Sequence, residues 1–133
     1  MLSFPESFRA ERVFFGPNGL CQGEKQPYPL EEGRKIRLSH ELFSQEALVL
    51  KGWPGQLSVA PDKGGRGFRL SCTNMPYIGL WHAPGTQAPF LCVEPWSSLP
   101  GREGITEELS AMEDRIKLPP GEKFESRLSI TLL

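Results

Sequence analysis

Glycine and proline interrupt this chain at short intervals. Its 133 residues include 14 Gly and 13 Pro. Proline lacks the backbone N–H that a helix interior needs, whereas tight turns use both residue types. Turn-forming sequences recur along the whole chain, at 16–19 (Gly-Pro-Asn-Gly), 53–55 (Trp-Pro-Gly), 62–65, 83–85 and 118–122. This pattern excludes an all-α fold and predicts short strands joined by turns.

Between the turns, the residues alternate between apolar and polar or form short apolar runs. The segments that predict strands are 13–15, 34–38, 47–50, 56–59, 68–72, 77–81, 90–93 and 124–132. Segment 47–50 is continuously apolar, as is typical of a strand buried on both faces. A helix is expected only over 106–116, where Leu109, Met112 and Ile116 recur at a spacing of three and four. Short strands at this rhythm predict an all-β antiparallel sandwich.

The length of the chain indicates how many domains it forms, and its charge indicates which classes of partner it can bind. A chain of 133 residues with 38% hydrophobic content supports one packed domain, which we expect over residues 1–133. Lys and Arg number 15 and Asp and Glu 16, a formal net charge of -1. Nucleic acids and anionic membranes require a basic excess, so neither is an expected partner. Early charges exclude a signal-peptide core and no apolar stretch reaches membrane-spanning length, so a cytoplasmic location is expected.

Common catalytic and metal-binding motifs are missing from the sequence. The cysteines form no Cys-x-x-Cys pair, and those at 72 and 92 lie in apolar runs that predict small buried side chains. His40 and His82 are too few for a metal cluster, so no metal is expected. Gly-Gly-Arg-Gly at 64–67 lacks the Lys-Ser/Thr pair of a phosphate loop and predicts a turn.

The segment 89–96, Pro-Phe-Leu-Cys-Val-Glu-Pro-Trp, is the most informative. An apolar strand over 90–93 is expected to end at Glu94, with Pro95 stopping the strand pairing and Trp96 following. A carboxylate beside an indole suits a sugar, because the sugar's C–H face packs on the ring while the carboxylate accepts a hydroxyl proton. From these residues alone, a solvated glutamate and a core tryptophan remain the alternative.

The same segment resembles the signature of the aldose 1-epimerases (galactose mutarotases), specifically the LacX-like branch. Segments 38–50 (Leu-Ser-His-Glu-Leu-Phe-Ser-Gln-Glu-Ala-Leu-Val-Leu), 75–81 (Met-Pro-Tyr-Ile-Gly-Leu-Trp) and 118–122 (Leu-Pro-Pro-Gly-Glu) resemble other parts of that branch, in the same order. The resemblance extends over nearly the whole chain and corresponds to the C-terminal half of such a protein. It implies part of the mutarotase supersandwich.

The resemblance also implies a reaction and roles for individual residues. An aldose 1-epimerase interconverts the α and β anomers of an aldose by two proton transfers, so no cofactor is implied. Glu94 occupies the position of the general base. Glu46 occupies the position of an acidic residue, usually Asp, that binds substrate hydroxyls. Trp96 and Trp81 are expected to line the sugar site, whereas Trp53, in a turn, is not.

The family's general acid is a histidine in a Gly-His-Pro-Ala-Phe type of motif, in the half that precedes the matched region. Neither that motif nor the family's arginine from the same half is found in this sequence. Whether the chain is an enzyme is therefore open. It is an aldose 1-epimerase-like protein or a truncated form of one, a non-catalytic carbohydrate-binding module, or a structural domain completed by another chain.

Two further expectations follow from strand geometry. If 77–81 and 89–93 form a hairpin, His82 lies about 16 Å from Glu94, too far to serve as its acid partner, and is a loop residue. A chain of this size is not expected to cover segment 47–50 on both faces, so self-association or a complementing chain is expected.

Overall fold

The computed structural model describes residues 1–112 and 114–133. Within these residues, ten strands form two five-stranded sheets. Sheet A has the order β10-β7-β6-β1-β4, with strands β10 Leu128–Leu132, β7 Phe68–Cys72, β6 Gln56–Val59, β1 Leu2–Ser3 and β4 Lys35–Ile36. Sheet B has the order β3-β2-β5-β8-β9, with strands β3 Cys21–Tyr28, β2 Ala10–Phe15, β5 Leu48–Lys51, β8 Tyr77–Trp81 and β9 Cys92–Trp96.

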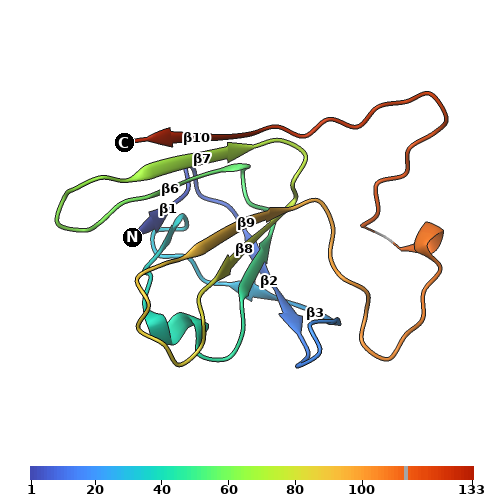
Figure 1. The fold of residues 1–133 in the computed structure, drawn as a ribbon, viewed down its shortest axis with the longest axis horizontal. Helices are drawn as coiled ribbons and strands as arrows, with labels where there is room; N and C mark the ends of the chain where they lie inside the picture. Colours follow the sequence, from blue (N-terminus) through green and yellow to red (C-terminus); the bar gives the residue numbers. More distant parts are fainter. Residues whose placement is uncertain (113) are drawn as a thin grey trace.

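All strand pairs of the two sheets are antiparallel, and Figure 1 shows the sheets as two layers. The predicted antiparallel β-sandwich is therefore confirmed. The strands predicted at 56–59, 68–72 and 77–81 form with those bounds, because each is short, alternating or apolar, and bounded by turn residues.

The helix predicted over 106–116, of which residue 113 lies outside the described residues, is wrong. That segment contains only a 3₁₀ helix, η2, at Leu109–Ala111. Leu109 is 69% exposed and Ile116 45% exposed, so the apolar stripe has no surface to pack against. A short amphipathic helix without tertiary packing is marginal in water.

The main core lies between the sheets. Its fully buried residues come from both layers, including Leu57 and Leu70 from sheet A and Leu48, Leu50 and Leu80 from sheet B. A second, smaller cluster covers the opposite face of sheet B, where Leu99 packs with Val13, Cys21, Val49 and Tyr77.

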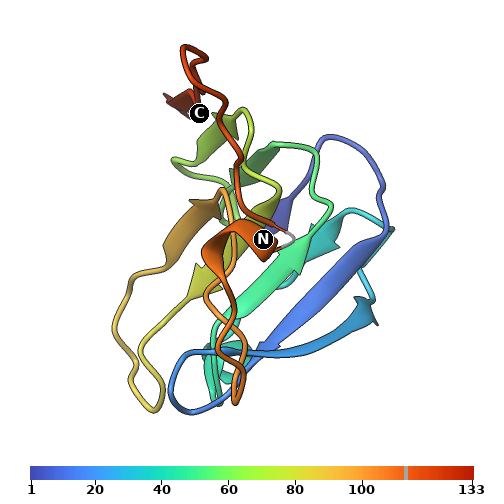
Figure 2. The ribbon, with the colours of Figure 1, turned by 90° about the vertical axis from the view of Figure 1, so that its right-hand side faces the viewer.

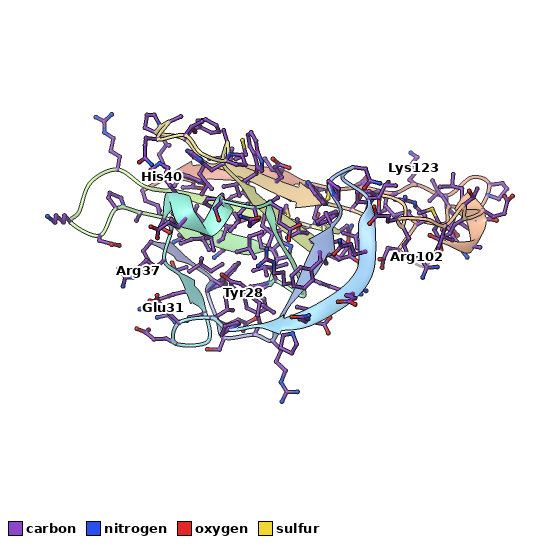
Figure 3. The ribbon with its side chains drawn as sticks, turned by 90° about the horizontal axis from the view of Figure 1, so that it is seen from below. Tyr28, Glu31, Arg37, His40, Arg102 and Lys123 are labelled. Carbon is purple, nitrogen blue, oxygen red and sulfur yellow. The ribbon has the colours of Figure 1, made fainter. Side chains whose placement is uncertain are left out.

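The segment after β9 provides this cover. In Figure 2 it lies in front of sheet B, and a cavity of about 200 Å³ remains between Leu99, Met112 and the strand residues Val13 and Cys21. In Figure 3, Arg102 and Lys123 of this part of the chain lie on the side of the molecule opposite His40.

Strand β5 is buried on both faces, as predicted from its apolar run. Leu48, Val49 and Leu50 are each at most 1% exposed. The expectation that a single chain could not cover this strand twice is wrong, because the segment after β9 returns over Val49. Self-association is therefore not needed to cover β5.

The expectation that Pro95 stops strand pairing is also wrong. Strand β9 runs through Pro95, which pairs with Ile78, to Trp96, so Glu94 lies at the centre of the strand rather than at its end. Strand β9 is an edge strand of sheet B. A proline is tolerated there because the side of the strand facing solvent needs no N–H donor.

All three cysteines are free thiols. Cys21 is buried, whereas Cys72 and Cys92, predicted from their apolar runs to be buried, are only half-buried. Cys72 lies beside the edge strand β10, where the opposite layer covers less of the side chain. Cys92 lies opposite Trp81 on the outer face of the edge strand β9, so it does not face the core between the sheets. In the part of the chain that the structure describes, no helix has the length and apolar character to span a membrane.

Candidate functional site

Glu94 lies on the outer face of sheet B, the face that does not pack on sheet A. It is directly opposite Gly79 on β8, and Gly79 is opposite Val49 of the outer cluster. Residues directly opposite one another share a face of the sheet. The Glu94 side chain is half-buried, and among the described residues its carboxylate has no ion pair or hydrogen bond. A half-buried carboxylate without a protein partner is free to accept a proton from a ligand.

Trp96 lies two residues further along β9, on the same face. Its ring meets the ring of Phe15 edge-on, with 6.0 Å between centroids and an interplanar angle of 80°. A Cβ placed on Gly79 would lie 3.4 Å from Trp96 Cε2 and 3.4 Å from Glu94 Cβ. The absence of a side chain at Gly79 therefore lets the indole and the Glu94 side chain lie close together above β8.

We expect Gly79→Val to destabilise the fold by about 1–3 kcal/mol, because the added methyl groups would overlap Glu94 and Trp96. Gly79→Ala should be nearly neutral, since its Cβ makes ordinary contacts. Urea unfolding measures both, with Gly101→Val as the control because nothing lies within 4 Å of a Cβ there. Equal losses for the two valine variants would contradict the close packing inferred above Gly79.

Glu46, the other candidate acidic residue, is held by strand β2. Its Oε1 accepts a hydrogen bond of 2.9 Å from Arg12 Nη2, and its Oε2 accepts one of 3.2 Å from the backbone N–H of Phe15. The two charged side chains are 27% and 22% exposed, and Arg12 Nε is buried without a hydrogen-bond partner among the described residues. The Arg12–Glu46 pair is thus a fixed, partly accessible group with one N–H donor unused.

Glu46 and Glu94 do not converge directly. Register places the Glu46 backbone two strands and three residues away from Glu94, which corresponds to about 14 Å. Phe15 connects the two, because its N–H contacts Glu46 and its ring contacts Trp96 beside Glu94.

The other two tryptophans occupy different environments. Trp81 is half-buried at the end of β8, two residues from Gly79 on the face that carries Glu94, with the Phe90 ring centroid 6.0 Å away. Trp53 belongs to the core between the sheets, and its indole N–H donates a 2.7 Å hydrogen bond to the Met75 carbonyl.

Both histidines lie away from Glu94. His82 is 3% exposed, and its Nε2 lies 2.6 Å from the Ala88 carbonyl oxygen. Its ring is 4.7 Å from that of His40 and 5.0 Å from that of Phe90, at a hollow of about 340 Å³. His40 begins the 3₁₀ helix η1 (His40–Phe43), labelled in Figure 3.

The reason that His82 is remote from Glu94 differs from the one expected. Glu94 pairs with Gly79, only three residues before His82, which is about 10 Å along the strand rather than 16 Å. Side chains alternate across a strand, so His82 follows Ile78 and Leu80 toward the inner face, whereas Glu94 is on the outer face. His82 is a loop residue, as predicted, and the sheet separates it from Glu94.

Cys21 belongs to the cluster on the outer face of sheet B. Burial, and to a lesser extent the charge of Asp114, raises the pKa of the Cys21 thiol, so this side chain stays protonated and unreactive. Within residues 1–112 and 114–133, no group of three His, Cys, Asp or Glu residues could hold a metal ion.

Three neighbours of the candidate residues were not predicted, namely Gly79, Phe15 and Arg12. A glycine inside an apolar strand signals close approach of another group, so Gly79 was detectable in the sequence. Phe15 and Arg12 were not, because their partners lie 81 and 34 residues away and depend on strand pairing.

The chain is similar in sequence to LacX proteins and in fold to galactose mutarotase-like proteins. Over 123 residues the chain is 28% identical to two curated proteins of Lactococcus lactis subsp. lactis, chromosomal and plasmid forms of Protein LacX. It superimposes on a galactose mutarotase-like protein from Lactobacillus casei with a TM-score of 0.79 and 22% identity. The resemblance to LacX-like proteins is confirmed. A galactose mutarotase related enzyme from Lactobacillus acidophilus gives a TM-score of 0.75 at 20% identity.

This chain matches less than half the length of each of these proteins. The matches use 90% of this chain but 40% of each LacX protein, and 98% of this chain but 44% of each solved structure. The chain thus has the fold of less than half of a galactose mutarotase-like protein. No protein-family model matches it.

Proposed function

We propose that this LacX-like chain carries the base-bearing part of an aldose 1-epimerase-like site, which interconverts the α and β anomers of an aldose. The observation that carries the proposal is the placement of Glu94: a half-buried, unpaired carboxylate on an accessible sheet face, next to the indole of Trp96. The resemblance to LacX and the mutarotase-like fold support the same assignment.

In the proposed reaction, Glu94 removes the proton of the C1 hydroxyl while an acid protonates the ring oxygen. The ring then opens, C1 rotates and the ring recloses, after which the protons return. Trp96 and Trp81 are assigned to the apolar face of the sugar, and Glu46 to its hydroxyl groups. Arg12 lies opposite Leu50 on the inner face of sheet B, so it holds Glu46 rather than the sugar. Both steps are proton transfers by side chains, so the mechanism requires no cofactor.

The acid is the missing element of this proposal. The ring of His82 contacts Phe43 of the core between the sheets and also His40, so this pair packs away from Glu94. A positioned general acid contributes typically about 100-fold or more. We therefore expect the chain alone to accelerate mutarotation weakly, which polarimetry of a panel of freshly dissolved aldoses measures. Rapid turnover that survives the double variant His40→Ala, His82→Ala would require an acid elsewhere in the chain.

The remote histidines favour one second candidate, a carbohydrate-binding module without catalysis. It uses the same face, with Glu94 accepting a hydroxyl hydrogen bond rather than a proton. Saturable sugar binding without any acceleration of mutarotation distinguishes it from the first proposal. Absence of both would favour a purely structural role.

Tryptophan fluorescence tests which indole faces the sugar. A variant that keeps only Trp96 (Trp53→Phe, Trp81→Phe) should change its emission on aldose titration. The matched variant that keeps only Trp53 (Trp81→Phe, Trp96→Phe) should not, because the Trp53 indole N–H is already bonded to Met75 inside the core. A saturable response of Trp53 alone would contradict this placement.

A further inference from the structure

Strand β10 lies at one end of sheet A and extends beyond the cover of sheet B. Leu57, Leu70 and Ile130 form one row across β6, β7 and β10, because Leu57 pairs with Leu70 and Leu70 with Ile130. Leu57 is 0%, Leu70 4% and Ile130 62% exposed. In Figure 1, β10 is the outermost strand of its layer. The apolar inner face of sheet A therefore continues onto β10, but the opposite layer stops before it.

Along the free edge of β10, the backbone N–H and C=O groups of every second residue point away from β7. Leu133 and Gly67 exchange two hydrogen bonds, of 2.9 and 3.4 Å, and Thr73 N–H donates to the Arg127 carbonyl. Bonded and non-bonded pairs alternate in an antiparallel ladder, so the odd-numbered residues bond to β7. The N–H and C=O groups of Leu128, Ile130 and Leu132 then point away from β7, to the free edge.

This edge lacks the protection that the other sheet edges carry. Strand β3 has Glu24, Lys25 and Pro27, β9 has Glu94 and Pro95, and β4 is only two residues long. Charges, prolines and short length are the usual means by which edge strands avoid pairing with other chains. The sequence of β10, Leu-Ser-Ile-Thr-Leu, has none of them, and its apolar side chains Leu128 and Leu132 are 55% and 84% exposed.

We propose that β10 is the docking edge for a second copy of this chain, in an antiparallel pair about a two-fold axis at Ile130. In that register, Ile130 faces Ile130 of the second copy, and Leu128 faces its Leu132. The outward N–H and C=O groups of one strand then meet their complements on the other. An edge that is complementary to itself gives a closed two-fold interface, which is the commonest form of homo-oligomer.

The apolar side chains gain cover in the same arrangement. Residues directly opposite one another in an antiparallel pair have Cβ atoms about 4.5–5.5 Å apart, within contact distance for Leu and Ile. The two sheets A become one continuous sheet, and the three exposed apolar residues of each copy pack against those of the other. This inference does not depend on the proposed sugar chemistry.

Light scattering and sedimentation of the full chain over a range of concentrations test the proposal. Wild-type protein should form a dimer that dissociates on dilution, and Ile130→Glu should be monomeric over the same range. Thr131→Glu is the matched control: it adds the same charge to the neighbouring residue on the opposite face, beside Arg69, and should remain dimeric. Far-UV circular dichroism confirms that each variant is folded.

Hydrogen exchange gives a second readout. The amides of Leu128, Ile130 and Leu132 should be protected in the dimer and exchange rapidly after dilution or in Ile130→Glu. The proposal is overturned by a wild-type monomer at all concentrations, which would leave the edge for a different chain. A dimer or aggregate that persists in Ile130→Glu, or one in which these amides stay unprotected, also overturns it.

Discussion

Glu94→Gln is expected to abolish the weak protein-dependent part of mutarotation, because a positioned general base contributes about 100- to 10,000-fold to a catalysed rate. Glutamine keeps the shape of the side chain but cannot accept the proton. The loss corresponds to about 3–5 kcal/mol of transition-state stabilisation. Polarimetry at several protein concentrations separates the catalysed rate from the spontaneous one.

The control for this variant is Glu122→Gln, which makes the same change at an exposed turn residue far along the chain. It should leave the catalysed rate unchanged. Sugar binding, followed through Trp96, should weaken in Glu94→Gln much less than catalysis if Glu94 acts as a base. A catalysed rate equal to that of the wild type would remove Glu94 from the proposed mechanism.

The largest effect on stability is expected from Leu50→Ala. Leu50 is 0% exposed in the centre of β5, between Arg12 on β2 and Ile78 on β8, and it faces the core between the sheets. Truncating a buried leucine typically costs about 2–5 kcal/mol, because transfer free energy is lost and a cavity remains. Urea unfolding should show a lower midpoint with little change in slope.

Leu109→Ala is the matched control, since Leu109 is 69% exposed in the 3₁₀ helix η2. We expect it to change the free energy of unfolding by less than about 0.5 kcal/mol. A comparable loss for both variants would mean that the segment after β9 packs more closely than the structure shows. A small loss for Leu50→Ala would contradict the two-layer core.

The candidate site divides into a part that local sequence predicts and a part that it does not. The sequence predicts Glu94 and Trp96 as candidate residues, but it ends their strand at Glu94. Only the structure, in which β9 runs through Pro95, places both side chains on one face of a strand. The Arg12–Glu46 pair depends on β2 and β5 lying side by side, with 34 residues between the two partners. The placement of His82 and Glu94 on opposite faces of sheet B likewise depends on the register of the β8–β9 hairpin. A shift of one residue would move the side chains of a strand to the other face.

The sequence by itself determined the class of the fold, because turn residues and apolar alternation are local properties. Strands β6, β7 and β8 follow directly from them. Strand β3 was missed: it contains Gly23 and Pro27 and is exposed over most of its length, so no apolar pattern marks it, and its pairing with β2 creates it. Only the tertiary structure decided which apolar faces are covered. Val49 and Ile130 both belong to apolar strand faces, yet Val49 is 0% and Ile130 62% exposed. The difference lies in whether another segment of the chain returns over the face, and that depends on non-local packing rather than on the residues themselves.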